Sequence, residues 1–257
     1  MRDFIQSRKS ANRELIAVNA DTDDERVAEI RRYFERYDVA LSSFRDETLP
    51  DRFLLLTEGE RCLAAIDVDT LYDYLIETLN SGSFAHRSAD DPELFHAIQA
   101  FLTNLDGTVY TVEREGKIPL VGISRVIEQR AGRTKGGTIH TGVQRLSRLR
   151  DERETWETYV RLADRGTDVN LYGVPDWRPP ATDSMTVFAD EDGGTVGDLW
   201  FVVSQGEDSD AASALVAQEV EAETYTGFWT FDPEYVGEIA AYVENELRPD
   251  LTRLRDE

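Results

Sequence analysis

The sequence predicts an α/β fold in which helices flank a mixed β-sheet core. Short apolar runs of strand length alternate with longer amphipathic runs along the chain. At 257 residues the chain is long enough for one large α/β domain or two small ones. Near the middle, strand-like runs at 138–141 and 169–172 enclose a helical run. Such a strand–helix–strand unit normally pairs its strands in parallel through a right-handed crossover.

The first half of the chain is predicted to form an N-terminal α/β unit over residues 15–91, after a polar tail at 1–14. The acidic residues from Asp21 to Asp24 are typical of a helix start, and Asp67 is suited to cap the next helix. A polar loop at 80–91 is a candidate boundary. The expected strands are Leu15–Ala20, Val39–Phe44, Phe53–Leu56 and Cys62–Ile66, and the inward helix positions are Val27, Ile30, Phe34 and Tyr37, then Leu71, Leu75 and Leu79.

The second half, residues 92–257, is predicted to form another α/β unit. Pro92, Pro119 and Pro233 each stand at the first position expected for a helix. The helical pattern of the central unit begins at Gln144, and Trp156 is expected to face the core. The expected strands are Thr108–Val112, Thr138–Thr141, Val169–Tyr172, Met185–Phe188, Leu199–Ser204, Ala214–Val220 and Thr224–Phe231.

The two halves resemble each other in the order of their predicted elements. Residues 15–79 run strand, helix, three strands, helix, and residues 138–247 run strand, helix, several strands, helix. In both halves the closing helix follows a strand and an aspartate, Asp67 or Asp232. We therefore expect an internal duplication, with two related α/β units.

The composition is strongly acidic. Aspartate and glutamate total 51 against 28 lysines and arginines, a formal charge of −23. With good apolar periodicity, such a chain is expected to be folded with a solvated acidic surface, as halophiles use in concentrated salt. Nucleic acid is not expected as a partner, because phosphates repel this charge.

The sequence contains few of the residue patterns that form catalytic, metal-binding or phosphate-binding sites. Cys62 is the single cysteine and lies in an apolar run, so we expect a small buried hydrophobe. The acid-rich turn at 21–25 does not match a calcium loop, and we expect helix caps there and no metal site. The basic loop at 130–137 lacks the spacing of a phosphate loop. The sequence identifies no cofactor. With no signal peptide or membrane span in the sequence, we expect a cytoplasmic protein without membrane insertion.

Several motifs in the second half occur together. They read Ile139-His-Thr-Gly-Val-Gln-Arg-Leu-Ser147 and Tyr172-Gly-Val-Pro-Asp-Trp177, with Ile118-Pro-Leu-Val-Gly-Ile-Ser-Arg-Val-Ile-Glu128 upstream and Asp198-Leu-Trp-Phe-Val-Val203 and Gly227-Phe-Trp-Thr-Phe-Asp-Pro233 downstream. This set resembles the DICT sensory domain, a family named for sensory domains of diguanylate cyclases and two-component systems. The resemblance is closest to stand-alone haloarchaeal members and is firmest over 118–247. It implies signal sensing, in a light-response or other environmental context, and names no ligand.

The candidate ligand site is a polar and aromatic group within this region. Arg125 and Glu128 are neighbours on one helix face, and His140 lies on a strand. Ligands of open α/β sheets favour the carboxyl edge of the strands, where the 173–177 segment is expected. If one pocket exists, His140, Arg125 and Trp177 are expected to line it. The full set of candidates is Arg125, Glu128, His140, Gln144, Tyr172, Asp176, Trp177, Trp200 and Trp229, of which Trp200 and Trp229 are also suited to the core.

These observations predict a non-enzymatic signal-sensing protein that binds a small ligand or a partner. No output module is visible in the sequence, so we expect a separate signalling protein, such as a kinase, cyclase or regulator, to receive the signal. Two alternatives stay open: an interaction or dimerisation module without a small ligand, and a small-molecule enzyme with an unrecognised site. The sequence does not indicate the oligomeric state.

Overall fold

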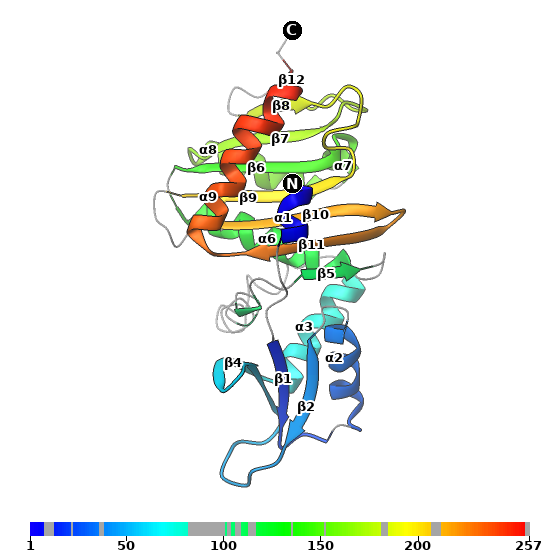
Figure 1. Ribbon diagram of the computed structural model, residues 1–257, viewed down its shortest axis with the longest axis vertical. Coiled ribbons are helices and arrows are strands. Elements are labelled where there is room, and N and C mark those ends of the chain that lie inside the picture. The colour runs from blue at the N-terminus through cyan, green and yellow to red at the C-terminus, as the bar shows by residue number, and fades with distance from the viewer. Residues whose placement is uncertain are drawn as a thin grey trace. The chain divides into compact units, whose positions relative to one another are not determined.

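A computed structural model describes residues 1–7, 13–21, 23–35, 39–81, 101, 104–105, 109–112, 117–134, 136–151, 153–180, 185–206 and 212–254. The chain divides into two compact units (Figure 1). The N-terminal unit spans residues 8–123, and the C-terminal unit comprises residues 124–257 together with residues 1–7. Part of the expected N-terminal tail is therefore a helix, α1 (Arg2–Ser7), of the C-terminal unit. The loop expected at 80–91 and the helix expected from Pro92 lie almost wholly outside the described residues.

The N-terminal unit is a four-stranded sheet with helices. Its elements are β1 (Arg13–Val18), α2 (Glu25–Glu35), β2 (Ala40–Phe44), β3 (Phe53–Glu58), β4 (Arg61–Asp67) and α3 (Val68–Ser81). The strand order is β2-β1-β3-β4, with β1 parallel to β2 and antiparallel to β3. Alternation along the strands buries Leu15, Leu54 and Leu56, together with Val27 and Ile30 of α2. β5 (Val109–Val112) and the first half of α6 (Lys117–Arg133) also belong to this unit.

The C-terminal unit is built on a larger mixed sheet. Its strands follow the order β12-β8-β7-β6-β9-β10-β11, in which β6, β7 and β8 are parallel and the remaining pairs are antiparallel. The strands are β6 (Thr138–Arg145), β7 (Asp168–Val174), β8 (Met185–Ala189), β9 (Leu199–Gln205), β10 (Ser213–Glu221), β11 (Thr224–Thr230) and β12 (Thr252–Arg253). The helices are α1, the second half of α6, α7 (Ser147–Asp151), α8 (Arg153–Asp164) and α9 (Pro233–Tyr242), which continues as a π-helix (Val243–Leu247) and a 3₁₀ turn (Arg248–Asp250).

Helices cover both faces of this larger sheet. In Figure 1 the orange-to-red helix formed by α9 and its π-helical continuation crosses the front of the strands, and α6 and α8 lie behind them. On the α9 face, Phe228 of β11 packs against Tyr235 with ring centroids 5.8 Å apart. On the opposite face, the guanidinium of Arg130 in α6 lies 5.0 Å from the ring centroid of Phe231. Successive side chains along a strand point to opposite faces of the sheet. A strand residue's place in this alternation therefore decides whether it faces α9 or faces α6 and α8.

The predicted α/β fold with a mixed sheet is confirmed, including the parallel pairing of the central strand–helix–strand unit. Three local expectations were wrong. β6 continues through Arg145, and helix begins only at Ser147, because Gln144 adopts a left-handed φ of 62° and extends the strand past a register shift. Trp156 of α8 is half-buried, and its ring packs edge-to-face on Trp177. Cys62 is exposed, because it lies on the edge strand β4.

The two units share a strand topology. In each, a first strand pairs in parallel with the strand that follows its helix and in antiparallel with a strand on its other side, and a further antiparallel strand comes next. The order β2-β1-β3-β4 thus corresponds to β7-β6-β9-β10. An internal duplication would give both units the same strand topology, as found here. The duplication itself stays a prediction.

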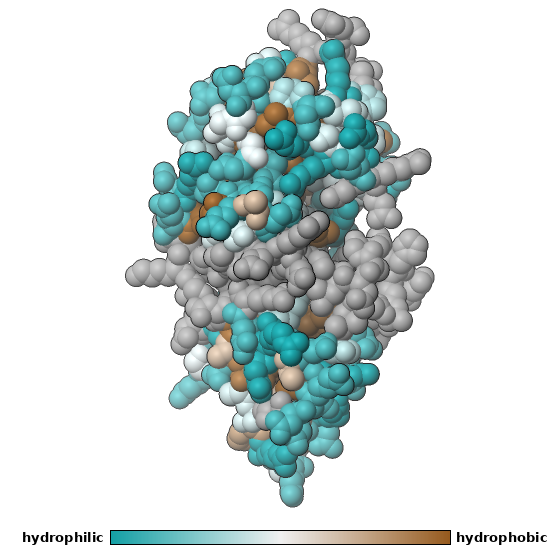
Figure 2. Space-filling model, turned by 90° about the vertical axis from the view of Figure 1, so that its right-hand side faces the viewer, coloured by the Kyte–Doolittle hydropathy of each residue, from teal (hydrophilic) through white to brown (hydrophobic). Residues whose placement is uncertain are grey.

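The surface that Figure 2 presents is mostly hydrophilic over both units. Few large apolar side chains of the described residues are exposed: Phe44, Leu49 and Val220. No helix in the described part of the chain is long and apolar enough to cross a membrane.

Candidate functional site

The structure divides the predicted site residues between the two faces of the larger sheet. His140 and Tyr172 point to the α9 face. Arg125 belongs to α6 on the opposite face, so the expectation that His140 and Arg125 line one cavity was wrong. The physical reason is strand alternation: Thr141, the neighbour of His140, interacts with Tyr159 of α8, and His140 therefore points the other way.

The α9 face carries a buried polar cluster around His140. The imidazole is fully buried, and its Nδ1 lies 2.9 Å from the hydroxyl of Tyr172, which is also fully buried. Arg248, in the 3₁₀ turn after the π-helix, donates to that hydroxyl from Nε at 3.3 Å and from Nη2 at 3.1 Å. Glu244 of the π-helix places Oε1 3.4 Å from His140 Nε2 and 3.9 Å from Arg248 Nη2. We call His140, Tyr172, Glu244 and Arg248 the histidine cluster.

An aromatic stack holds the histidine cluster in place. The ring of Tyr172 stacks on Phe188 of β8, with centroids 5.0 Å apart and an interplanar angle of 12°. The guanidinium of Arg248 lies 4.9 Å from the centroid of the same Phe188 ring. A guanidinium against an aromatic face gains cation–π attraction and loses little rotamer freedom. The ring of Phe188 therefore orients both Tyr172 and Arg248.

Burial sets the protonation states in the histidine cluster. Burial, reinforced by the positive charge of Arg248, lowers the pKa of His140 to about 4, so its imidazole is neutral at pH 7. Burial likewise raises the pKa of Tyr172 to about 12, against the hydrogen bond from Arg248, which acts to lower it. The cluster at neutral pH thus holds a neutral imidazole and a neutral phenol beneath a guanidinium and a carboxylate.

On the opposite face, Arg125 and Glu128 form an ion pair in which Glu128 is buried and Arg125 is partly exposed. Arg125 donates from Nη1 to Glu128 at 2.8 Å and from Nη2 to the hydroxyl of Thr155 at 2.7 Å. Glu128, with a side chain only 3% exposed, also accepts from the hydroxyl of Tyr159 at 2.8 Å. Burial, and next the charge of Glu128, raises the pKa of Tyr159 well above its ordinary value. These bonds join α6 to α8.

Gln144 joins the end of β6 to the β10–β11 hairpin. Its amide donates to Glu219 at 2.7 Å, and its carbonyl oxygen accepts from the hydroxyl of Tyr225 at 3.3 Å. Glu219 also accepts from the backbone N–H of Glu223 at 2.8 Å; burial raises the pKa of Glu219, but these hydrogen bonds outweigh it and hold the pKa below its usual value. Trp200 is half-buried and packs edge-to-face on Tyr225.

The remaining candidates make structural contacts within the C-terminal unit: Asp176, Trp177 and Trp229. Asp176 accepts from the backbone N–H of Ser147 at 2.9 Å and from its hydroxyl at 2.7 Å, which secures the start of α7. Burial raises the pKa of Asp176, but these bonds outweigh it and lower the pKa overall. Trp177 packs edge-to-face on Trp156 with centroids 6.1 Å apart. Trp229 is buried in the core.

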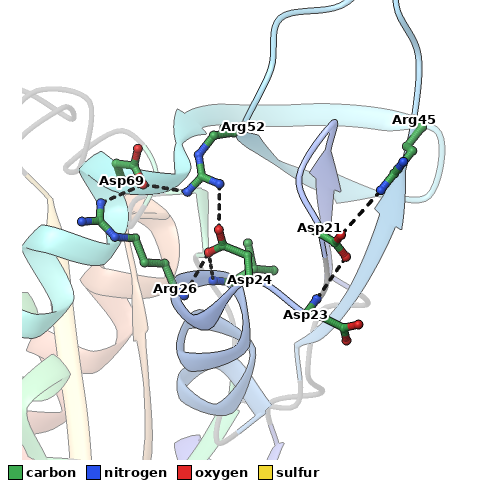
Figure 3. Close-up of polar contacts among 8 residues, drawn as sticks. Asp21, Asp23, Asp24, Arg26, Arg45, Arg52 and Asp69 are labelled. Carbon is green, nitrogen blue, oxygen red and sulfur yellow. Dashed lines mark hydrogen bonds and ion pairs between the residues drawn. The ribbon is translucent and has the colours of Figure 1, made fainter.

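A separate ion-pair network occupies the N-terminal unit (Figure 3). Arg52, at a left-handed φ of 59°, bonds Asp24 at 2.8 Å and Asp69 at 2.9 Å, and Arg26 also bonds Asp69 at 2.8 Å. These arginine bonds lower the pKa of both carboxyl groups. Asp24 also accepts from the first N–H groups of α2, as a helix cap does. Within the described residues no histidine, cysteine or acidic group is arranged to hold a metal ion.

Sequence reasoning missed Glu244, Arg248 and Phe188. Glu244 and Arg248 are four residues apart near the chain's end, a spacing that signals a helix-face ion pair. That spacing alone did not link them to His140, which is more than 100 residues away. The signal available in the sequence was Pro249, which disfavours regular α-helix around it and marks the irregular helix end that carries Arg248.

Comparison with known proteins leaves the family unidentified. No protein-family model matches the chain, and no curated protein matches it. One similar solved structure is a polyphosphate kinase from Porphyromonas gingivalis, at 12% identity and a TM-score of 0.34, covering 95% of this chain and 47% of that one. The chain thus spans about half the length of that protein. Another is a phosphatidylserine synthase from Haemophilus influenzae, at 12% identity and a TM-score of 0.35, covering 98% of this chain and 84% of that one. Likeness at this level carries no argument about function.

Proposed function

We propose that the chain is a non-enzymatic signal-sensing protein that binds a small ligand or a partner and relays its state to a separate output protein. The observation that carries the proposal is the histidine cluster, because it connects a buried histidine in the central strand to the irregular end of the C-terminal helix. The resemblance to DICT sensory domains supports the same proposal. It also favours a cytoplasmic kinase, cyclase or regulator as the output partner, in a light or other environmental response.

The placement of the histidine cluster suits a sensor because it runs from core to surface. His140 and Tyr172 are fully buried, whereas the side chains of Glu244 and Arg248 are 45% and 30% exposed. Buried polar groups cost free energy unless fully bonded, so a core without them would be more stable. A π-helical segment is rare and frequently marks a functional site. A signal reaching Glu244 or Arg248 would therefore act on both the core and the helix end.

The cluster is less suited to catalysis. A histidine, an arginine and an acid within reach of one another is the arrangement expected of an acid–base site. However, the imidazole is fully buried, and burial lowers the pKa of His140 to about 4. A general base works best with a pKa near the operating pH. A sensing role accounts better for a histidine that is neutral and covered.

Native mass spectrometry of the protein purified from its own cells tests the proposal, followed by hydrogen exchange. We expect a retained small molecule or a bound partner, and slower backbone exchange over residues 243–250 in the bound form than in the stripped form. The His140→Gln variant is the matched control and should lose this difference. A protein that carries nothing, or whose exchange over 243–250 is the same in both forms, would overturn the proposal.

A further inference from the structure

The hydrogen bonds of the histidine cluster fix which imidazole nitrogen carries the proton. The hydroxyl oxygen of Tyr172 accepts two bonds from Arg248, so its own proton is directed to Nδ1 of His140. With Nδ1 accepting, the neutral imidazole carries its proton on Nε2. Among the described residues, this buried Nε2–H has no hydrogen-bond partner. An unsatisfied buried donor is costly, and its persistence calls for an acceptor that the protein does not supply.

Glu244 lies close to this donor but does not satisfy it. Its Oε1 is 3.4 Å from His140 Nε2 in a direction that does not give a hydrogen bond, and 3.9 Å from Arg248 Nη2, beyond hydrogen-bond range. The side chain is 45% exposed, so it can turn to solvent at little cost. Arg248 directs Nε and Nη2 to Tyr172, and Nη2 also lies 3.4 Å from His140 Nδ1; within the described residues its Nη1 makes no hydrogen bond.

From this arrangement we infer that His140 Nε2 and the Arg248 guanidinium form a binding subsite for the carboxylate of a small ligand, with Glu244 as its internal competitor. The inference rests on the proposed function and gives it a ligand class. A carboxylate offers two coplanar acceptor oxygens, which match one imidazole N–H and one guanidinium N–H. Glu244 supplies the same group from within the chain, but its direction gives no hydrogen bond to Nε2 and it lies 3.9 Å from Arg248 Nη2.

Competition between Glu244 and the ligand carboxylate explains how ligand binding would change the protein surface. When the ligand carboxylate takes the position beside Nε2, the carboxylate of Glu244 must leave, because two like charges cannot share the site at low cost. Glu244 belongs to the π-helix, so its departure changes the contacts of that segment with the core. The aromatic stack on Phe188 keeps Arg248 fixed while this happens.

Benzoate is the probe, with uncharged benzamide as its control, and the readout is the ring resonance of His140. The chain has three histidines, so this resonance is assigned by its loss in His140→Gln. Benzoate should shift it and benzamide should not. Glu244→Gln should bind benzoate about tenfold more tightly, equal to about 1.4 kcal/mol, because the internal competitor has lost its charge. Arg248→Lys should bind it about tenfold more weakly, since it loses the planar fork.

Glu246→Gln is the matched control, because it makes the same charge change at an exposed position of the same π-helix. It should leave benzoate affinity within about twofold of wild type. The inference is overturned if benzoate shifts the His140 resonance in neither wild type nor Glu244→Gln, or if Glu246→Gln tightens binding as much as Glu244→Gln. A retained natural ligand whose affinity is unchanged in Glu244→Gln and Arg248→Lys would refute this subsite while leaving the sensing proposal intact.

Discussion

Protonation of the buried His140 should make the fold sensitive to mild acid. The pKa of His140 is lowered from 6.5 to about 4, first by burial and then by the charge of Arg248. Above pH 6.5 the imidazole is neutral in both folded and unfolded chains. As the pH falls from 6.5 to 4, the unfolded chain takes up a proton that the folded chain refuses, so stability is lost in that window. At about 1.4 kcal/mol per pKa unit, the loss is about 2 kcal/mol by pH 5 and about 3 kcal/mol by pH 4.

The assay is chemical unfolding of wild type and His140→Gln between pH 7.5 and 4.5 at constant salt. A glutamine carbonyl can still accept the hydrogen bond of Tyr172, but it does not titrate. Subtracting the two curves removes the contribution of carboxylates and of the other histidines, which both proteins share. The difference in unfolding free energy should narrow by about 2 kcal/mol between pH 7 and pH 5. Parallel curves would show that His140 titrates normally and is not buried as described.

Three further predictions concern the whole fold. Because self-repulsion at a charge of −23 is relieved by screening, the melting temperature should rise from about 0.1 M to multi-molar salt, and no rise would exclude a halophilic surface. Trp156→Ala should cost only about 1–2 kcal/mol in chemical unfolding, because this half-buried ring packs chiefly on Trp177; a loss above about 3 kcal/mol would place it in the core. Gly142→Ala should cost about 1–3 kcal/mol, because its Cβ would collide with the ring of Phe201, whereas Gly194→Ala meets nothing within 4 Å and should be neutral; equal effects of the two would refute the close approach.

The sequence was sufficient for the order and type of most described elements because their signals are local. The apolar run at 199–204, the amphipathic run after Ser147 and the proline after Asp232 each determine structure within a few residues. The parallel pairing of β6 with β7 also followed, because a helix between two strands leaves little alternative. These features depend on spacing, which a single sequence displays.

The candidate site was less predictable because it depends on which face of the sheet each strand residue points to and on contacts between residues far apart in the sequence. Gln144 was expected to start a helix, and nothing local signals the left-handed φ that carries β6 on to Arg145. Strand alternation turns His140 toward α9 and away from Arg125 of α6, and this separation depends on which face of the sheet each helix covers. Arg248 contacts His140 although the two residues are 108 positions apart in the sequence, and no local pattern predicts such a contact.

The shared topology of the two units sharpens the case for the histidine cluster. In both units a backbone N–H just after the first strand donates to the last carbonyl of the parallel strand: Asn19 to Phe44 at 2.9 Å and Leu146 to Val174 at 3.0 Å. Each unit also has an aspartate two residues beyond that carbonyl, but the contacts differ: the backbone N–H of Asp46 donates to the side chain of Asn19, whereas the carboxylate of Asp176 accepts from the N–H of Ser147. The backbone hydrogen bond that closes each parallel strand pair is thus common to the two units, and a shared feature of this kind needs no ligand.

The same correspondence separates His140 from that shared framework. Asn170 lies as many residues before Val174 as Ala40 lies before Phe44, so their strand partners His140 and Glu14 also correspond; Glu14 and Ala40 are exposed. In the C-terminal unit this face is covered by α9 and its π-helical end, and the position corresponding to exposed Glu14 is a fully buried histidine. A covering helix needs only apolar residues beneath it, as Phe228 shows against Tyr235. The polar contacts of His140 with Tyr172 and Arg248 are therefore additional to what the fold requires, which is why we propose a sensing role for them.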